Sequence, residues 1–324
     1  MLYRNDGKSG NGTLLKRSGQ ARGSTALPFP EAVAVRGREL YPPGLRLALE
    51  KLDQLIGLNR IKDLIHETTA FYCVQARRTQ MGLKANPAVI HMIFKGNPGT
   101  GKTSVARLLG PIFREMGALK EGQLVEVERA DLVGEYIGHT AQKTRQLVTK
   151  ARGGILFVDE AYSLGRGGDK DFGKEAIDLL VKAMEDMKDD LVLILAGYRR
   201  EMETFLRINP GLRSRFPLHL TFLDYTADEL LRIGQQMFEE RQYHLGPSAR
   251  EYLERWIRSM SDADGAVGVE GNARFMRNLV ESTVRRQSLR LVKSGALTRE
   301  DFMAITRRDV EEGIRYCLSE RQAR

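Results

Sequence analysis

The chain has 324 residues, of which 42% are hydrophobic and 29% are charged, and its formal net charge is +9. This is the composition of a soluble globular protein, and the length suggests two domains plus a tail. No apolar stretch approaches the length that crosses a bilayer, and the N-terminus lacks the apolar segment of a secretory signal. A membrane protein or an exported protein is therefore not expected.

The cysteines and the basic residues narrow the setting further. Cys73 and Cys317 lie far apart in the sequence and form no metal or redox motif, which favours a reducing cytoplasm. The basic residues are spread along the chain without interleaved aromatics or zinc-finger spacing, so specific nucleic-acid binding is not expected. An acidic protein partner or a sugar phosphate remains compatible with the charge.

The chain begins with a segment that shows no apolar periodicity. Residues 1–44 are rich in Gly, Ser, Arg and Lys, which predicts a disordered basic tail. From residue 45 the apolar positions return, and an ordered turn at residues 55–58 precedes a predicted long helix over residues 59–82.

Strand-like apolar runs then alternate with helical periods. The predicted strands lie at residues 90–95, 123–128, 154–159, 191–196 and 217–222. This alternation predicts an α/β core over residues 45–222, with a five-stranded parallel sheet that binds ligands at the carboxyl ends of its strands. Beyond it, helical periods at residues 226–242, 247–260, 271–293 and 300–318 predict a small, mostly helical domain over residues 223–324.

A phosphate-binding loop follows the first predicted strand. The run is Gly96-Asn97-Pro98-Gly99-Thr100-Gly101-Lys102-Thr103-Ser104. Its glycines let backbone N–H groups turn toward an anion, and the next helix points its positive end at the same place. Lys102 is expected to reach the β- and γ-phosphates of a nucleoside triphosphate, and Thr103 to contribute a hydroxyl to Mg²⁺.

An acidic pair follows the third predicted strand. The run Gly154-Ile155-Leu156-Phe157-Val158 is typical of a buried central strand, and Asp159 and Glu160 come directly after it. On a strand neighbouring the phosphate loop, Asp159 would hold Mg²⁺ and Glu160 would polarise the attacking water.

Four runs carry a resemblance to a known family. Residues His91–Thr103, Arg129–Thr140, Asp171–Ala176 and Asn209–Pro217 resemble the AAA+ ATPases, and within them the CbxX/CfxQ family, which includes red-type rubisco activase. The resemblance spans about residues 50 to 310. The same four runs also resemble a member of this family that acts in sporulation.

The resemblance implies roles for several arginines. Arg215, with Arg213 as the second choice, is expected to act as a finger that reaches the γ-phosphate bound by a neighbouring subunit. Arg274 is expected to sense the γ-phosphate from within its own subunit, and Arg277 lies one turn further along the helix.

Three further segments gain roles from the same resemblance. The run Tyr136-Ile137-Gly138 aligns with a central pore loop, the alternative being that Tyr136 packs in the core. Ile56, Gly57 and Leu58 align with the segment that contacts adenine. Tyr198 stands at the end of the fourth strand, where many AAA+ proteins carry Asn or Thr, so its expected sensor role departs from the pattern.

Together these features predict a cytoplasmic ATPase that forms a homo-oligomeric ring, a hexamer, and couples Mg-ATP hydrolysis to remodelling of a protein client in sporulation. The alternatives are a rubisco activase-like ATPase, a nucleotide-switched binding scaffold with little turnover, and a nucleic-acid motor. Stimulation by ribulose bisphosphate, the turnover rate, and stimulation by DNA or RNA distinguish them.

Overall fold

The computed structural model describes residues 40–86, 89–136, 138–166, 172–260, 271–295 and 297–322. Most of the predicted tail over residues 1–44 lies outside these ranges, and the first α-helix begins at Pro43. The described residues belong to a unit that extends from Gly37 to Arg324.

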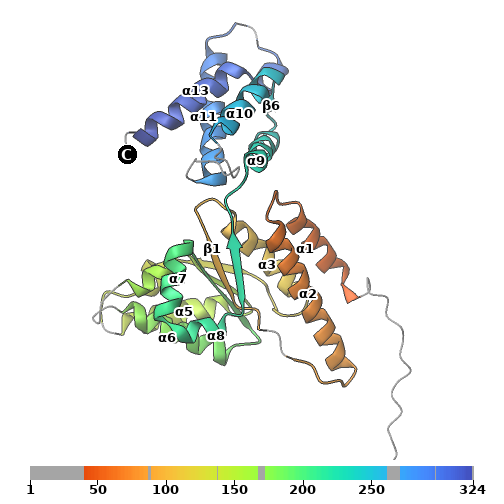
Figure 1. Cartoon of the computed structure of the whole chain (residues 1–324), viewed down its shortest axis with the longest axis vertical. Coiled ribbons are helices and arrows are strands. Elements are labelled where there is room, and N and C mark those ends of the chain that lie inside the picture. Colours follow the sequence, from red (N-terminus) through yellow and green to blue (C-terminus); the bar gives the residue numbers. More distant parts are fainter. Residues whose placement is uncertain are drawn as a thin grey trace, which may run out of the picture. The chain divides into compact units, whose positions relative to one another are not determined.

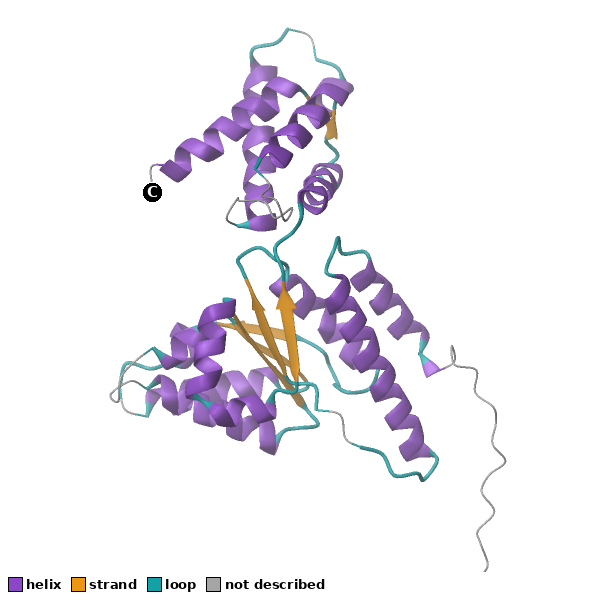
Figure 2. Ribbon diagram, viewed as in Figure 1, coloured by secondary structure: helices purple, strands orange, loops and turns teal. Residues whose placement is uncertain are grey.

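The predicted five-stranded parallel sheet is confirmed (Figure 2). Its strands are β1 (Met92–Gly96), β2 (Leu124–Val127), β3 (Gly154–Val158), β4 (Leu191–Gly197) and β5 (Leu218–Phe222). Their spatial order is β2-β3-β4-β1-β5, and every pair is parallel. Because β4 separates β3 from β1, the expectation that the acidic pair follows a strand neighbouring the phosphate-loop strand is wrong.

Helices cover both faces of this sheet. They are α1 (Pro43–Asp53), α2 (Asn59–Gln80), α3 (Lys102–Glu115), α4 (Arg129–Leu132), α5 (His139–Ala151), the 3₁₀ helix η2 (Ala161–Gly165), α6 (Gly173–Asp186), α7 (Arg199–Ile208) and α8 (Pro210–Arg215). Figure 1 shows α1, α2 and α3 on one side of the sheet and α5, α6 and α7 on the other.

The side-chain alternation of the strands explains the two layers. Along β1, Met92 and Phe94 join the core beneath α1, α2 and α3, whereas Ile93 joins the core beneath α5, α6 and α7. A parallel sheet covered on both faces needs apolar residues at consecutive positions, which is why these strands are continuous apolar runs.

The chain after β5 is mostly helical. Its elements are α9 (Ala227–Glu239), β6 (His244–Leu245), α10 (Pro247–Ser259), α11 (Asn272–Val292), α12 (Arg299–Met303), β7 (Ala304–Ile305) and α13 (Arg307–Gln322). They enclose a third apolar core. The segment predicted at residues 300–318 is divided into α12 and α13 because β7 pairs with β6, a contact distant in sequence that helical periodicity does not reveal.

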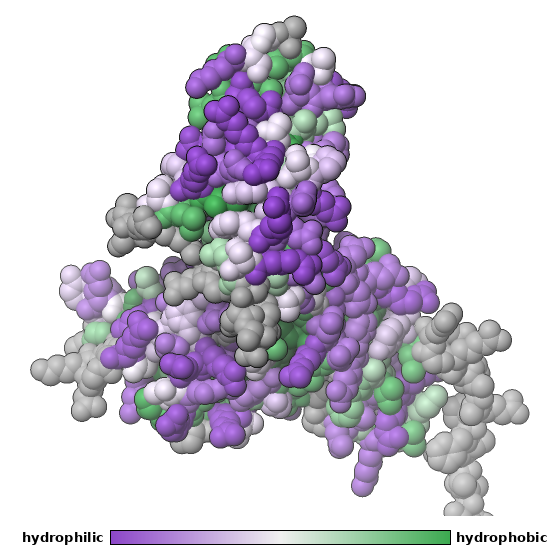
Figure 3. All heavy atoms as spheres, turned by 45° about the horizontal axis from the view of Figure 1, so that its top comes forward, coloured by the Kyte–Doolittle hydropathy of each residue, from purple (hydrophilic) through white to green (hydrophobic). Residues whose placement is uncertain are grey.

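The surface is consistent with the high content of charged residues. The face drawn in Figure 3 is mainly hydrophilic, with small separate hydrophobic spots. Among the described residues, no helix combines the length and the apolarity that a bilayer-spanning segment needs.

Candidate nucleotide site

A cavity of about 410 Å³ lies at the carboxyl ends of the strands, within the range of small-molecule sites. The residues that line it are Leu55, Ile56, Leu58, Pro98, Gly99, Gly101, Lys102, Thr103, Ser104, Asp159, Glu160, Gly197, Tyr198, Tyr225, Ile233, Gln236, Met237, Glu240, Ala273, Arg274 and Arg277. The lining combines an apolar group with a cluster of charges, which suits a ligand with a flat apolar part and an ionic part.

The phosphate loop has the backbone that its glycines predict. Gly99 and Gly101 have φ angles of 73° and 94°, in the left-handed region that favours glycine. A Cβ on Gly96 would stand 2.5 Å from the carbonyl oxygen of Phe222. Helix α3 begins at Lys102, directly after the loop, so its N-terminal N–H groups are available to an anion.

Lys102 is anchored by the loop itself. Its Nζ donates hydrogen bonds of 2.9 Å to the Gly96 carbonyl and 2.8 Å to the Asn97 carbonyl. Burial lowers the pKa of the ammonium below its ordinary value, and the charge of Arg274 adds to this, while the nearby carboxylates oppose it. An anionic ligand in the cavity would stabilise the charged ammonium.

The acidic pair reaches the same cavity although β4 intervenes. The Asp159 N–H donates to the Val127 carbonyl over 2.9 Å, which fixes the backbone at the end of β3. Glu160 is exposed and has a φ of 46°, an unusual conformation for a residue with a side chain. Strained backbone of this kind is often found at functional sites.

The donors expected for Mg²⁺ fit together. Thr103 and Asp159 line one cavity, and the described residues contain no cluster of three or more His, Cys, Asp or Glu that would form a separate metal site. One hydroxyl and one carboxylate match a Mg²⁺ ion that takes its other ligands from phosphate and water.

The helix α11 closes one side of the cavity. The Ala273 N–H donates to the Gly99 carbonyl over 3.1 Å, so the start of α11 contacts the phosphate loop directly. The predicted sensor Arg274 and its neighbour Arg277 both line the cavity. The positive charges of Arg274 and Arg277 on α11 therefore line the same cavity as Lys102 of the phosphate loop, where phosphates are expected to bind.

The apolar end of the cavity includes residues that were not predicted from the sequence. Ile56 and Leu58 line the cavity as predicted, and Gly57 lies between them with a φ of 66°. Tyr225 and the α9 residues Ile233, Gln236, Met237 and Glu240 also line it. The helical spacing of the α9 residues was visible in the sequence, but their position over the cavity depends on the fold.

Two tyrosines meet at the rim. Tyr198 lines the cavity at the end of β4, and its ring stacks on Tyr162 with centroids 5.8 Å apart. Burial raises the pKa of the Tyr162 hydroxyl well above its ordinary value, and the Glu160 charge adds to this shift. The Tyr162 hydroxyl therefore remains a neutral hydrogen-bond donor beside Glu160.

Several predicted site residues are not brought to the cavity of their own chain. Arg213, Arg215, Tyr136 and Gly138 are absent from its lining. The Arg215 guanidinium donates to Glu185 on α6 over 2.6 Å and to the Gly211 carbonyl over 2.9 Å. Glu185 was not foreseen, because the pairing joins α6 and α8 through tertiary contacts.

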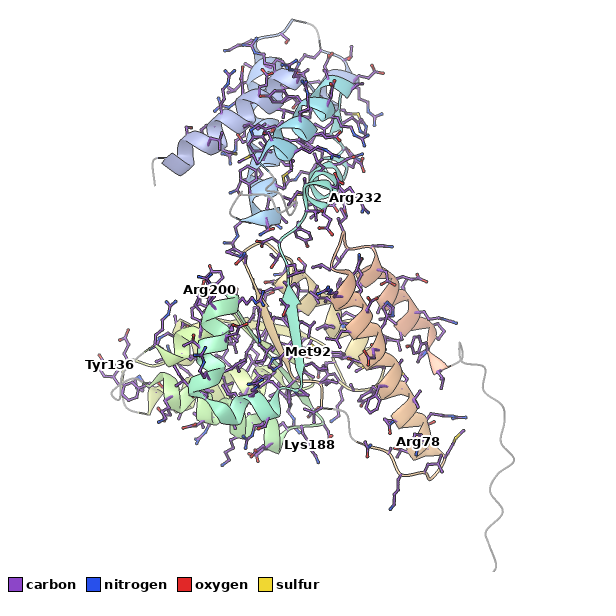
Figure 4. The ribbon with its side chains drawn as sticks, viewed as in Figure 1. Arg78, Met92, Tyr136, Lys188, Arg200 and Arg232 are labelled. Atoms are coloured by element: carbon purple, nitrogen blue, oxygen red, sulfur yellow. The ribbon has the colours of Figure 1, made fainter. Side chains whose placement is uncertain are left out.

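Tyr136 and Gly138, the two described residues of the expected pore loop, are exposed. The Tyr136 side chain is 66% exposed and its ring contacts the His139 ring edge-on, with centroids 5.3 Å apart. Figure 4 shows Tyr136 at the outer end of a loop, far from Met92 in the sheet. The alternative of a core tyrosine is therefore wrong, and Ile137 lies outside the described residues.

Two sequence families match the chain. The AAA family, described as the ATPase family associated with various cellular activities, matches residues 92–223, and the AAA lid domain matches residues 226–319.

Similar proteins cover most of the chain. Stage V sporulation protein K of Bacillus subtilis (strain 168) is 49% identical over 268 residues, which are 82% of this chain and 83% of that protein. The chloroplastic ribulose bisphosphate carboxylase/oxygenase activase of Cyanidioschyzon merolae (strain NIES-3377 / 10D) is 43% identical, covering 81% of this chain and 89% of that protein. Protein CbbX of Cereibacter sphaeroides is 41% identical, covering 88% and 92%.

Solved structures share the fold. The FIGL-1 AAA domain in complex with ADP aligns with a TM-score of 0.55 at 19% identity, over 82% of this chain and 83% of that one. The RuvB Holliday junction branch migration motor of Thermotoga maritima aligns with a TM-score of 0.53 at 22% identity, over 86% and 72%.

Proposed function

This chain is an AAA+ ATPase of the CbxX/CfxQ family, and we propose that it forms a ring that couples Mg-ATP hydrolysis to the remodelling of a protein client. The observation that carries the proposal is the shared cavity of Lys102, Thr103, Asp159, Glu160 and Arg274. These residues come from the phosphate loop, the end of β3 and the start of α11. Their combined chemistry suits a triphosphate with its metal ion.

The residues divide the work of hydrolysis. Lys102 and Arg274 offset negative charge on the phosphates, and the exposed Glu160 carboxylate accepts a proton from the attacking water. Thr103 and Asp159 would hold Mg²⁺, which would supply positive charge to offset that of the phosphates. Ile56, Leu58 and Tyr225 provide an apolar surface for the base, and Tyr198 offers a hydroxyl near the acidic pair.

The proposal of a ring is supported by the position of the arginine that is expected to act as the finger. Arg215 lies outside the cavity lining of its own chain, so an arginine finger at this position must serve a neighbouring subunit. Arg213 is the second candidate for the same role. A closed ring, proposed as a hexamer, gives every cavity such a neighbour.

Client contact is assigned to the segment Tyr136-Ile137-Gly138. An exposed aromatic ring can contact an extended polypeptide without sequence preference, and Gly138, with a φ of 84°, permits the turn into α5. We propose that this activity takes place in the cytoplasm. We also propose that the chain divides into an α/β core over residues 45–222 and a lid over residues 223–324.

The client class has two candidates. The similarity to stage V sporulation protein K favours a sporulation client, and the similarity to a rubisco activase favours a carboxylase. Full-length protein tested with and without ribulose bisphosphate distinguishes them, because only the second candidate predicts stimulation of ATP turnover.

The ATPase proposal is tested by measuring turnover against protein concentration, alongside molecular mass in solution. The specific rate should rise steeply as rings assemble. Negligible turnover at every concentration, with nucleotide bound, would favour the scaffold alternative. Stimulation by DNA or RNA would favour a nucleic-acid motor.

A further inference from the structure

Asp224 occupies the connection between β5 and α9, where three distant segments meet. The Asn97 side-chain amide of the phosphate loop donates to its two carboxylate oxygens over 3.0 and 2.9 Å. The Asn272 side-chain amide at the start of α11 donates to Asp224 Oδ1 over 2.8 Å. One exposed carboxylate thus joins the phosphate loop to the lid.

Asn97 ties this carboxylate to the phosphate-binding lysine. Its carbonyl accepts hydrogen bonds from Lys102 Nζ and from the Thr100 hydroxyl, each over 2.8 Å. Its amide points the other way, to Asp224. If Lys102 turned to a phosphate, it would give up its hydrogen bond to the carbonyl of Asn97, the residue whose side chain holds Asp224.

Asn272 ties the same carboxylate to the sensor arginine. It is 6% exposed, its φ is 47°, and its Oδ1 accepts the Tyr225 N–H over 2.9 Å. Arg274 follows two residues later on the same helix. The hydrogen bond between Asn272 and Asp224 therefore lies at the start of the helix that carries Arg274 into the cavity lining.

We infer that Asp224 is a positioning residue that couples occupancy of the phosphate loop to the placement of the lid and of Arg274. The inference rests on the proposed nucleotide site and adds a residue that is not part of the cavity lining. A carboxylate suits the role because it accepts only, with enough lone pairs for two amide donors. Its loss should weaken selectivity for ATP over ADP, since that selectivity depends on Arg274 reaching the γ-phosphate.

The test compares variants of the full chain by the affinity for fluorescent ATP and ADP analogues and by turnover. Asp224→Ala should reduce the ratio of ATP to ADP affinity by roughly 10- to 100-fold, the range for lost hydrogen bonds to a charged group. A role in stability alone would lower both affinities together. The matched control is Asp228→Ala, because Asp228 is exposed and pairs with Arg258 over 2.9 Å.

A reciprocal swap makes the test specific. Asn272→Asp sets two carboxylates against each other and should show the same loss. Adding Asp224→Asn should restore selectivity, because the new amide donates to residue 272 while its oxygen still accepts from Asn97. Asp is also tolerated at a positive φ.

The outcomes separate the two proposals. Nucleotide binding and hydrolysis by the unaltered chain, with an unchanged affinity ratio in Asp224→Ala or no recovery in the swap, would overturn the coupling and leave the ATPase proposal standing. If the unaltered chain bound neither analogue, both would be overturned.

Discussion

The cavity around Lys102 and the surface around Arg215 differ in how they hold positive charge. Three basic residues, Lys102, Arg274 and Arg277, line the cavity together with the acidic pair. At the surface, Arg215 is paired with Glu185 and is absent from that lining. One chain therefore gathers the charges of the proposed nucleotide site in a single cavity, whereas the proposed finger lies outside that cavity in an ion pair at the surface.

The energetics of the two regions follow the same contrast. Burial disfavours the charged form of Lys102, and an anionic ligand in the cavity would offset this cost. The Arg215 and Glu185 side chains are 37% and 57% exposed, and such surface pairs contribute about 0–1 kcal/mol. The pair with Glu185 can therefore be exchanged for a phosphate of a neighbouring subunit at little cost.

The largest expected effect is in the cavity. Lys102→Ala should abolish ATP binding, because it removes the side-chain cation held at the centre of the phosphate loop. Calorimetric titration with Mg-ATP measures this. Retained binding at the affinity of the unaltered chain would show that the backbone N–H groups suffice and would weaken the contrast between the two regions.

Arg215→Ala should retain ATP binding and lower turnover by roughly 10³- to 10⁵-fold, the range for an arginine finger. Arg258→Ala is the matched control, since it also breaks an exposed ion pair of 2.9 Å. If the loss falls on Arg213→Ala instead, Arg213 is the finger.

Mixing sharpens this test. Mixtures of Arg215→Ala with Lys102→Ala should regain part of the turnover, because some cavities combine an intact lysine with a neighbour's intact Arg215. Confirmed mixed rings that regain no activity at any ratio would exclude a role between subunits.

Glu160→Gln should bind ATP and hydrolyse it roughly 10²- to 10⁴-fold more slowly, as expected for a lost general base. Thr103 and Asp159 are untouched, so trapped nucleotide should accumulate. Radiolabelled ATP retained after gel filtration measures the trapping. Hydrolysis at the normal rate would remove Glu160 from the role of base.

Lowering the pH should destabilise the fold through a buried histidine next to the sheet that carries the cavity. His91 precedes β1, its Nδ1 accepts the Leu193 N–H over 3.1 Å, and burial lowers its pKa to about 4. The unfolded chain, with an ordinary His pKa of about 6.5, binds more protons between about pH 4 and 6.5, so the free energy of unfolding falls as the pH falls through this window. The share from His91 is roughly 3 kcal/mol.

His91→Asn retains an acceptor and removes the titration. Urea unfolding across the window should show a shallower pH dependence in this variant. Equal slopes in the two proteins would assign the acid sensitivity to other groups.

The smallest effect is expected at the surface segment. Tyr136→Ala should change the free energy of unfolding by less than about 1 kcal/mol, because the side chain is 66% exposed. ATP turnover should persist while work on a protein client is lost. Phe113→Ala, which truncates a buried ring, is the stability control and should cost about 3–5 kcal/mol. A comparable loss of stability in Tyr136→Ala would contradict the pore assignment.

The features that could be predicted from the sequence are those that depend on residues close together in the chain. Gly99 and Gly101 permit the positive φ angles, and Lys102 begins a helix, because loop glycines and the apolar spacing after them act over one or two turns. The parallel sheet was also predictable, since consecutive apolar residues in short runs require cover on both faces.

Tertiary structure decided the rest. The insertion of β4 between β1 and β3, the pairing of Arg215 with Glu185, and the junction at Asp224 each join segments far apart in the sequence. Their order in space depends on which apolar faces pack together, and a local pattern holds no information on that choice. The sequence by itself therefore determined the nucleotide loop and the fold class, whereas the long-range packing of strands and lid determined which charges share the cavity and which remain at the surface.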